Sequence, residues 1–237
     1  MCGNLGDPIV AKDTLQIYEY LREANPTMGL QMHTNGSGRT DKWWKELAKL
    51  NVNVVFGIDG LADTHAKYRI NTDWKKIIHN VMTFVDAGGE ARWDMLVFKH
   101  NEHQIEEAKT LAKSYGVDKV AFKTAQIYEY TDGNPLIPSD EKYSRYTKNQ
   151  QGQYELKYKV TDECWKMWHS CVITWDGQVV PCCFDKDAEH PMGRLDQQNF
   201  DEIWHSDAYQ KFRESLFHSR SQIEMCKNCS EGSKVWA

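Results

Sequence analysis

Hydrophobic and polar positions follow two alternating patterns along the first 125 residues. Short, almost continuous apolar runs of strand length recur, and each is followed by a stretch in which apolar residues return every three or four positions, as on one face of a helix. Repeated strand-then-helix units predict an α/β fold, with a parallel sheet covered by helices. The strand-like runs are Leu30–Thr34, Val52–Ile58, Ala91–Phe98 and Val117–Thr124.

The predicted helices begin at positions that carry capping signals. Asp13 is followed by Gln16 three residues later, which is the spacing of a capping box, and Asp73 precedes a helix closed by Gly88-Gly89. A further helix follows Asp41, and the last of this region runs over 102–115. Either a doubly wound sheet or a barrel fits this order of elements. In both, the carboxyl ends of the strands form the functional site.

The regular pattern stops at residue 126. Residues 126–161 are rich in Tyr, Gln, Lys and Asp and are interpreted as a connector between region 1–125 and region 162–237. In the last region, Cys171–Thr174 and Gln178–Cys182 are strand-like and flank the hairpin turn Trp175-Asp176-Gly177. The segment Phe200–Phe217 predicts a single helix. We therefore expect a larger α/β region followed by a small α+β module.

Composition excludes several classes of protein. The 237 residues include 41% hydrophobic residues, and 29 Lys+Arg against 34 Asp+Glu give a net charge of −5. No basic block indicates a nucleic-acid partner. No apolar run is long enough to span a bilayer, and no secretory signal is visible, so the expected location is cytoplasmic.

Cysteines give the strongest chemical signal, since six of the seven lie in the last third of the chain. Cys226 and Cys229 are separated by two residues and can direct both thiolates at one metal or cluster. A hairpin can bring a second pair to the same point. Four thiolates suit either a tetrahedral zinc ion or a 4Fe–4S cluster. The ligand set stays open at two points. Cys171 precedes the same hairpin as Cys164. Cys183 is next to Cys182, and because neighbouring strand residues point to opposite faces, only one of these two can face the metal.

Histidines and glycines add weaker signals. His33 and His100 stand at strand ends and could face the barrel interior, although a hydrogen-bonded structural histidine is the more common case. The segment Cys2-Gly3-Asn4-Leu5-Gly6-Asp7-Pro8 contains two glycines, which allow a ligand to approach the main chain closely.

Taken in order, these motifs resemble those of radical S-adenosylmethionine (SAM) enzymes. Residues 3–8, GNLGDP, resemble the glycine-rich motif that contacts the SAM amino group in that family. Thr34-Asn35-Gly36 matches the end of the following strand, and residues 57–69 resemble the next strand and loop, which approach the SAM ribose or carboxylate. The resemblance implies SAM contacts from Gly3, Asn4, Gly6, Asp7, Thr34, Asn35, Asp59 and Arg69.

The C-terminal region resembles the SPASM module, which follows such barrels and holds an auxiliary iron–sulfur cluster. The matching features are Cys-x12-Gly-x4-Cys, Gly193 and Leu195, Glu202-Ile203-Trp204, and Cys-x2-Cys. The resemblance implies a partial (β/α) radical SAM barrel joined to a cysteine-rich module. It also implies 4Fe–4S ligation by Cys164, Cys182, Cys226 and Cys229.

The resemblance implies radical-based modification of a peptide or protein, with SAM as cofactor of the full-length parent and a flavodoxin or ferredoxin as reductant. The family's Cys-x3-Cys-x2-Cys motif, which holds the SAM-cleaving cluster, does not occur in this sequence. We therefore expect a fragment that does not cleave SAM by itself. Two alternatives stay open. One is a zinc-binding structural or interaction protein without catalysis, and the other is a degenerate, non-catalytic relative that only binds a peptide.

Overall fold

The computed structural model describes residues 1, 6–117, 119–158 and 160–229. The chain divides into two compact units, residues 1–155 (unit 1) and 156–237 (unit 2). Most of the expected connector therefore belongs to unit 1. The connector contains the short strands β5 (Tyr146–Lys148) and β6 (Tyr154–Leu156), which lie side by side in a two-stranded sheet.

Unit 1 is built on a four-stranded parallel sheet with strand order β1-β2-β3-β4. Each strand lies beside the one that precedes it in sequence, and the order never reverses. A doubly wound sheet would show such a reversal, whereas successive units of a (β/α) barrel would not. Within the described residues the sheet stays open, as a partial barrel. Its strands are β1 (Leu30–Thr34), β2 (Val52–Gly57), β3 (Ala91–Val97) and β4 (Lys119–Thr124).

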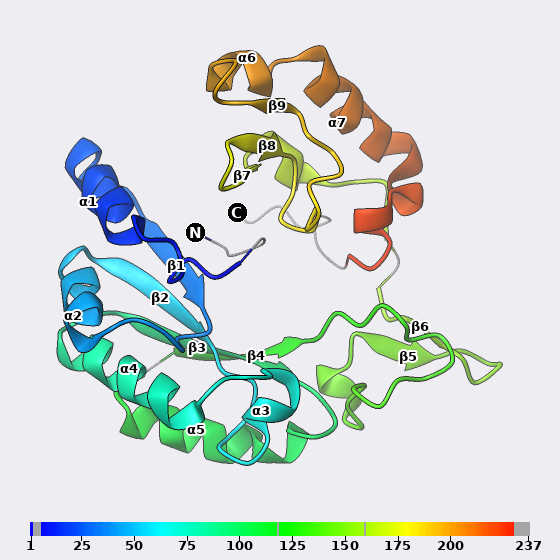
Figure 1. Cartoon of the computed structure of the whole chain (residues 1–237). Coiled ribbons are helices and arrows are strands. Elements are labelled where there is room, and N and C mark those ends of the chain that lie inside the picture. The colour runs from blue at the N-terminus through cyan, green and yellow to red at the C-terminus, as the bar shows by residue number, and fades with distance from the viewer. Residues whose placement is uncertain (2–5, 118, 159, 230–237) are drawn as a thin grey trace. The chain divides into compact units, whose positions relative to one another are not determined.

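Helices cover one side of this sheet (Figure 1). They are α1 (Thr14–Ala24), α2 (Asp41–Lys49), α4 (Trp74–Asp86) and α5 (Ile105–Ser114), with the one-turn α3 (His65–Tyr68) and the 3-10 turn η1 (Glu102–Gln104) between them. Asp73 caps α4 as predicted, accepting from the main-chain N–H groups of Lys75 and Lys76. The capping box predicted at Asp13 is wrong. Its side chain makes no cap hydrogen bond, because its main chain (φ −94°, ψ 8°) is not in the extended region that capping residues adopt.

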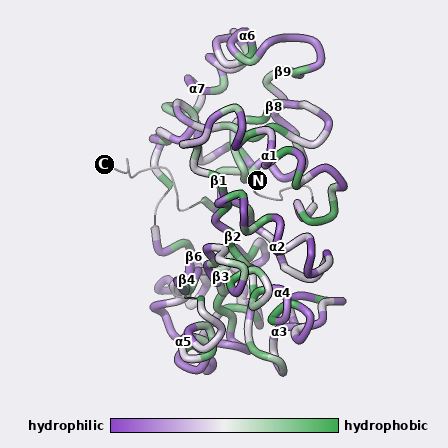
Figure 2. Tube along the Cα trace, turned by 90° about the vertical axis from the view of Figure 1, so that its left-hand side faces the viewer, coloured by the Kyte–Doolittle hydropathy of each residue, from purple (hydrophilic) through white to green (hydrophobic). Residues whose placement is uncertain are grey.

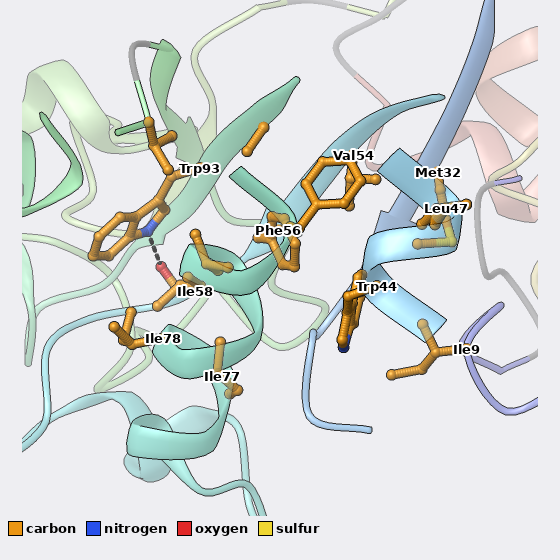
Figure 3. Close-up of a cluster of buried hydrophobic side chains, with 14 of the residues drawn as sticks. Ile9, Met32, Trp44, Leu47, Val54, Phe56, Ile58, Ile77, Ile78 and Trp93 are labelled. Carbon is orange, nitrogen blue, oxygen red and sulfur yellow. Dashed lines mark hydrogen bonds between the residues drawn. The ribbon is translucent and has the colours of Figure 1, made fainter. Parts of the chain in front are cut away.

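Large aromatic side chains fill the layer between sheet and helices (Figure 3). Trp44 from α2 packs against Phe56 from β2 with ring centroids 5.5 Å apart. The buried indole of Trp93 donates from Nε1 to the carbonyl oxygen of Ile58 over 2.7 Å, which satisfies its one polar atom. The run along β2 is mostly hydrophobic in Figure 2. The helix-facing positions of the strands therefore form the core and leave the alternate positions on the opposite face.

The described part of unit 2 has a three-stranded antiparallel sheet and two α-helices, one of 5 residues and one of 13. The sheet consists of β7 (Val172–Ile173), β8 (Gln178–Val180) and β9 (Gly193–Arg194). Gly177 turns the predicted hairpin with φ of +83°. The predicted single helix over 200–217 is wrong, because the segment forms α6 (Phe200–Trp204) and α7 (Asp207–Ser219). Ser206 interrupts it with an extended main chain, and its side chain caps α7 by accepting from the Tyr209 N–H. Among the described residues, no helix is long and apolar enough to cross a bilayer.

Candidate functional site

A cleft of about 270 Å³ opens on the face of the sheet opposite the helices. The polar residues at the strand ends meet there because the carboxyl ends of parallel strands share one edge of a sheet. Gly3 and Asn4 lie outside the described residues. The other six predicted SAM contacts all line this cleft, namely Gly6, Asp7, Thr34, Asn35, Asp59 and Arg69.

Asp7 fastens residues 6–8, the described part of the glycine-rich segment, to the end of β1. Its Oδ1 accepts from the Thr34 hydroxyl over 2.7 Å and from the Ile9 N–H over 3.1 Å. Its Oδ2 accepts from the Asn35 N–H over 2.6 Å. Hydrogen bonds to an ionised acceptor are among the stronger ones in proteins. The carboxylate therefore fixes the main chain at the cleft wall. The three donors that it binds, from Ile9, Thr34 and Asn35, all belong to the protein.

Asp59 is the most buried charged group of the cleft. Its side chain is 0% exposed, and Arg69, whose side chain is 33% exposed, donates from Nε to Oδ2 over 2.6 Å. Oδ1 accepts from the Leu96 N–H over 2.6 Å. Burial raises the pKa of Asp59 above its ordinary value, although Arg69 and the Leu96 N–H act in the opposite direction. The ion pair holds the β2 end, the following loop and β3 together.

Sequence reasoning missed part of the cleft lining. Asp94 and Lys123 contribute to the lining from β3 and β4. His33, for which both an interior-facing and a hydrogen-bonded structural position were open, lines the cleft too, and its Nε2 lies 3.1 Å from Gln31 Oε1. All three side chains stand on the strand face opposite the core. Because successive side chains of a strand point to opposite faces, the two-residue alternation along each strand was the sequence signal that could have found them. Burial lowers the pKa of His33, which favours the neutral ring. His100 does not line the cleft and stacks on Phe98, with ring centroids 5.3 Å apart.

In unit 2, four cysteines line one buried cavity. Cys164 lies just before the 3-10 turn η3 (Trp165–Trp168), and Cys182 follows β8. Cys226 ends the turn η5 (Glu224–Cys226), and Cys229 comes three residues later. The exposed fraction of each of the four is below 10%. The rest of the lining is mostly apolar, from Met167, Phe184, Leu216 and Met225, and it also includes the two basic residues Lys166 and Arg220.

The donor chemistry of this cavity fits an iron–sulfur cluster. Soft thiolates are the usual ligands of such clusters, and apolar walls limit solvent access. Burial raises the pKa of Cys226 to about 11, so binding a metal at this thiol displaces a proton. No three His, Cys, Asp or Glu side chains within the described ranges are grouped so that they could hold a single metal ion.

The two remaining cysteines of this unit lie outside the cavity lining. Cys171 is half-buried and packs with Val179, Ile203 and Tyr209. Cys183 accepts a hydrogen bond from Lys166 Nζ over 3.5 Å. A hydrogen bond from Cys182, assisted by Lys166, lowers the pKa of Cys183 below its ordinary value. Cys171 therefore lies in a separate apolar cluster, whereas Cys183 contacts Cys182 and packs against the cluster that contains the cavity cysteines without lining the cavity itself. The role of the four predicted ligands stays a prediction.

Comparison with protein-family models identifies residues 164–230 as a SPASM iron–sulfur cluster-binding domain. The chain is 36% identical over 63 residues to the S-adenosyl-L-methionine-dependent 2-deoxy-scyllo-inosamine dehydrogenase of Niallia circulans, covering 26% of this chain and 25% of that protein. It is 21% identical over 229 residues to the cysteine-type anaerobic sulfatase-maturating enzyme of Clostridium novyi (strain NT), covering 84% and 60%. The chain thus spans less than two thirds of either relative.

Solved structures share the fold over nearly the whole chain. Streptococcus suis SuiB bound to S-adenosylmethionine superposes with a TM-score of 0.65 at 14% identity, covering 96% of this chain and 60% of SuiB. Histidine-tagged anSMEcpe with bound AdoMet gives 0.64 at 15% identity, covering 96% and 69%. Native anSMEcpe with AdoMet and the Cp18Cys peptide gives 0.59 at 15% identity, covering 95% and 71%. At these identities the likeness establishes the fold.

Proposed function

We propose that this chain, which has the radical SAM fold and a C-terminal SPASM domain, takes part in the radical-based modification of a peptide or protein. The observation that carries the proposal is the grouping of residues around two separate sites. Six predicted SAM contacts line the cleft of unit 1, and four cysteines line the cavity of unit 2. One fold neighbour holds both AdoMet and a peptide, which supports a peptidyl substrate.

In this proposal the cleft of unit 1 would bind SAM, which in the full-length parent would supply the radical that abstracts hydrogen from the substrate; this chain, which has no Cys-x3-Cys-x2-Cys motif, would not cleave SAM by itself. The chain's own residues orient the cofactor. Asp7 holds the main chain around Gly6 and Asp7 against the end of β1, at the cleft wall where the amino end of SAM would bind. The Asp59–Arg69 pair positions the Arg69 guanidinium, which is partly exposed at the cleft and suits a carboxylate or ribose oxygen.

In unit 2 the proposed ligands of a 4Fe–4S cluster are Cys164, Cys182, Cys226 and Cys229. They come from three segments that the hairpin and α7 bring together, so the site depends on the fold of the whole unit. A protein reductant such as a flavodoxin or ferredoxin would supply electrons to this class of chemistry.

Metal content of the 237-residue protein tests the proposal. The protein is reconstituted without oxygen in the presence of iron, sulfide and zinc, desalted, and measured for each metal by mass spectrometry. We expect about four iron and four sulfide per chain, with the brown colour of a 4Fe–4S cluster. One zinc per chain with no iron would instead support the structural zinc protein.

A further inference from the structure

Arg220 is a buried guanidinium that lies against the cysteine cavity. It is the first residue of the turn η4 (Arg220–Gln222), directly after α7, and only 2% of it is exposed. Its Nη2 donates to Cys229 Sγ over 3.8 Å. Its Nη1 donates to the main-chain carbonyl oxygens of Thr161, over 2.9 Å, and Glu163. The side chain is therefore anchored on the polypeptide just before Cys164 and aimed at a sulfur of the cavity lining.

Arg220 places a fixed positive charge beside the cavity. Arginine stays protonated in proteins, so this charge is kept on burial. Deprotonated thiolates of a bound cluster would supply negative charge at the cavity that Arg220 lines.

We propose that Arg220 is a positioning residue that raises the reduction potential of the SPASM cluster by holding a fixed positive charge and an N–H donor against the Cys229 sulfur. This inference rests on the proposed function, because it requires the cluster. One-electron reduction adds a negative charge to the cluster, and a nearby cation stabilises the reduced form more than the oxidised form. Hydrogen bonds to the sulfurs, net charge and solvent exposure are the terms that set such potentials.

The chain offers a matched control in Lys227. It stands between the proposed ligands Cys226 and Cys229 in sequence, so it is a cation in the same loop. Its side chain is 53% exposed, and Nζ pairs with Glu224 over 2.6 Å. Water and salt screen an exposed charge strongly, whereas they screen a buried one much less. Replacing Lys227 should therefore leave the potential almost unchanged.

The experiment compares Arg220→Met, Arg220→Lys and Lys227→Met with the wild type, each reconstituted without oxygen and checked for iron content. The midpoint potential is measured by redox titration with detection of the reduced cluster by electron paramagnetic resonance. For Arg220→Met we expect at least a tenfold less favourable one-electron reduction, a shift of about 59 mV to lower potential. Arg220→Lys should shift less, and Lys227→Met should match the wild type. Full iron content with an unchanged potential in Arg220→Met would overturn the proposal.

A second measurement needs no variant and covers the case in which Arg220→Met fails to hold its cluster. Wild-type protein labelled with ¹⁵N-arginine is reduced and examined by pulsed electron paramagnetic resonance. Hyperfine coupling between the cluster and an arginine ¹⁵N is expected, and its absence would overturn the proposal. If the wild type takes up no iron, the proposed function fails instead, and that outcome is distinct from a cluster that forms without sensing Arg220.

Discussion

Replacing Asp59 by Asn tests whether the buried ion pair organises the cleft. The variant keeps the size of the side chain, and its Oδ1 can still accept from the Leu96 N–H. It loses the charge, and the new amide N–H₂ group faces the Arg69 Nε donor. Breaking a fully buried pair costs about 3–5 kcal/mol, and an exposed pair is worth about 0–1 kcal/mol. Because Arg69 is one-third exposed and can be rehydrated, we expect a loss of about 2 kcal/mol at pH 7.

The pH dependence of this loss follows from the raised pKa of Asp59. A carboxyl whose pKa is higher in the folded state contributes most stability below its unfolded value of about 3.9, and that contribution falls as pH rises through the folded pKa. Asparagine does not titrate. The stability difference between the wild type and Asp59→Asn should therefore be larger near pH 4 than at pH 7.

Hydrogen exchange measured by mass spectrometry gives the assay, because peptides from β2 and β3 report the local opening free energy of unit 1 alone. Glu46→Gln is the control, since its pair with Lys49 on α2 is exposed and its loss should change stability by no more than about 0.5 kcal/mol. A loss below about 0.5 kcal/mol for Asp59→Asn, or a loss that is greater at pH 7 than at pH 4, would refute the reasoning.

Three further predictions concern SAM binding in the cleft, the stability of unit 1 and the cleavage of SAM. Asp7→Asn should weaken SAM binding about tenfold in calorimetry because the loop loses an ionised acceptor, while Asp13→Asn, at a residue without a cap hydrogen bond, should bind normally. Gly36→Ala should lower stability by about 1–3 kcal/mol in thermal melts, since φ is +70° and a Cβ would lie 2.9 Å from Phe56. Gly88→Ala, which also has a positive φ but open space at its Cβ, should lose less stability. An equal loss of stability in the two variants would contradict the clash with Phe56. The 237-residue chain should form no 5′-deoxyadenosine above a no-protein control, because it has no Cys-x3-Cys-x2-Cys motif; formation of the nucleoside would contradict this.

The frame of unit 1 was predictable because its strands are continuous apolar runs. The run Leu30–Thr34 forms β1 with the predicted bounds, and Val52–Ile58 differs from β2 by one residue. Residues far apart in sequence, such as Asn35 and Asp59, could be expected at one cleft because parallel strands end at a common edge, whereas Asp7 was expected there only from the family resemblance. Helical periodicity alone could not reveal the break at Ser206, since apolar spacing continues across it.

Side-chain direction was the part that the sequence could not supply. Whether Asp94 and Lys123 face the cleft depends on which strand face the helices cover, and that is decided by packing of residues such as Trp93. In unit 2 the same limit applies to Cys164 and Cys171. Both precede the hairpin, and only the folded chain shows that Cys164 lines the cavity, whereas Cys171 packs in a separate apolar cluster.

The most direct test of the four-thiolate site is the iron content of single Ser replacements at the six cysteines of unit 2, each reconstituted without oxygen. Losing one ligand exposes an iron to solvent and oxygen, so the cluster should be lost or become labile. Replacing a thiol outside the cavity should cost only packing, on the order of 1 kcal/mol. We predict that iron is lost in the variants of Cys164, Cys182, Cys226 and Cys229 and retained in Cys171→Ser and Cys183→Ser. Loss of iron in Cys171→Ser with retention in Cys164→Ser would contradict the account.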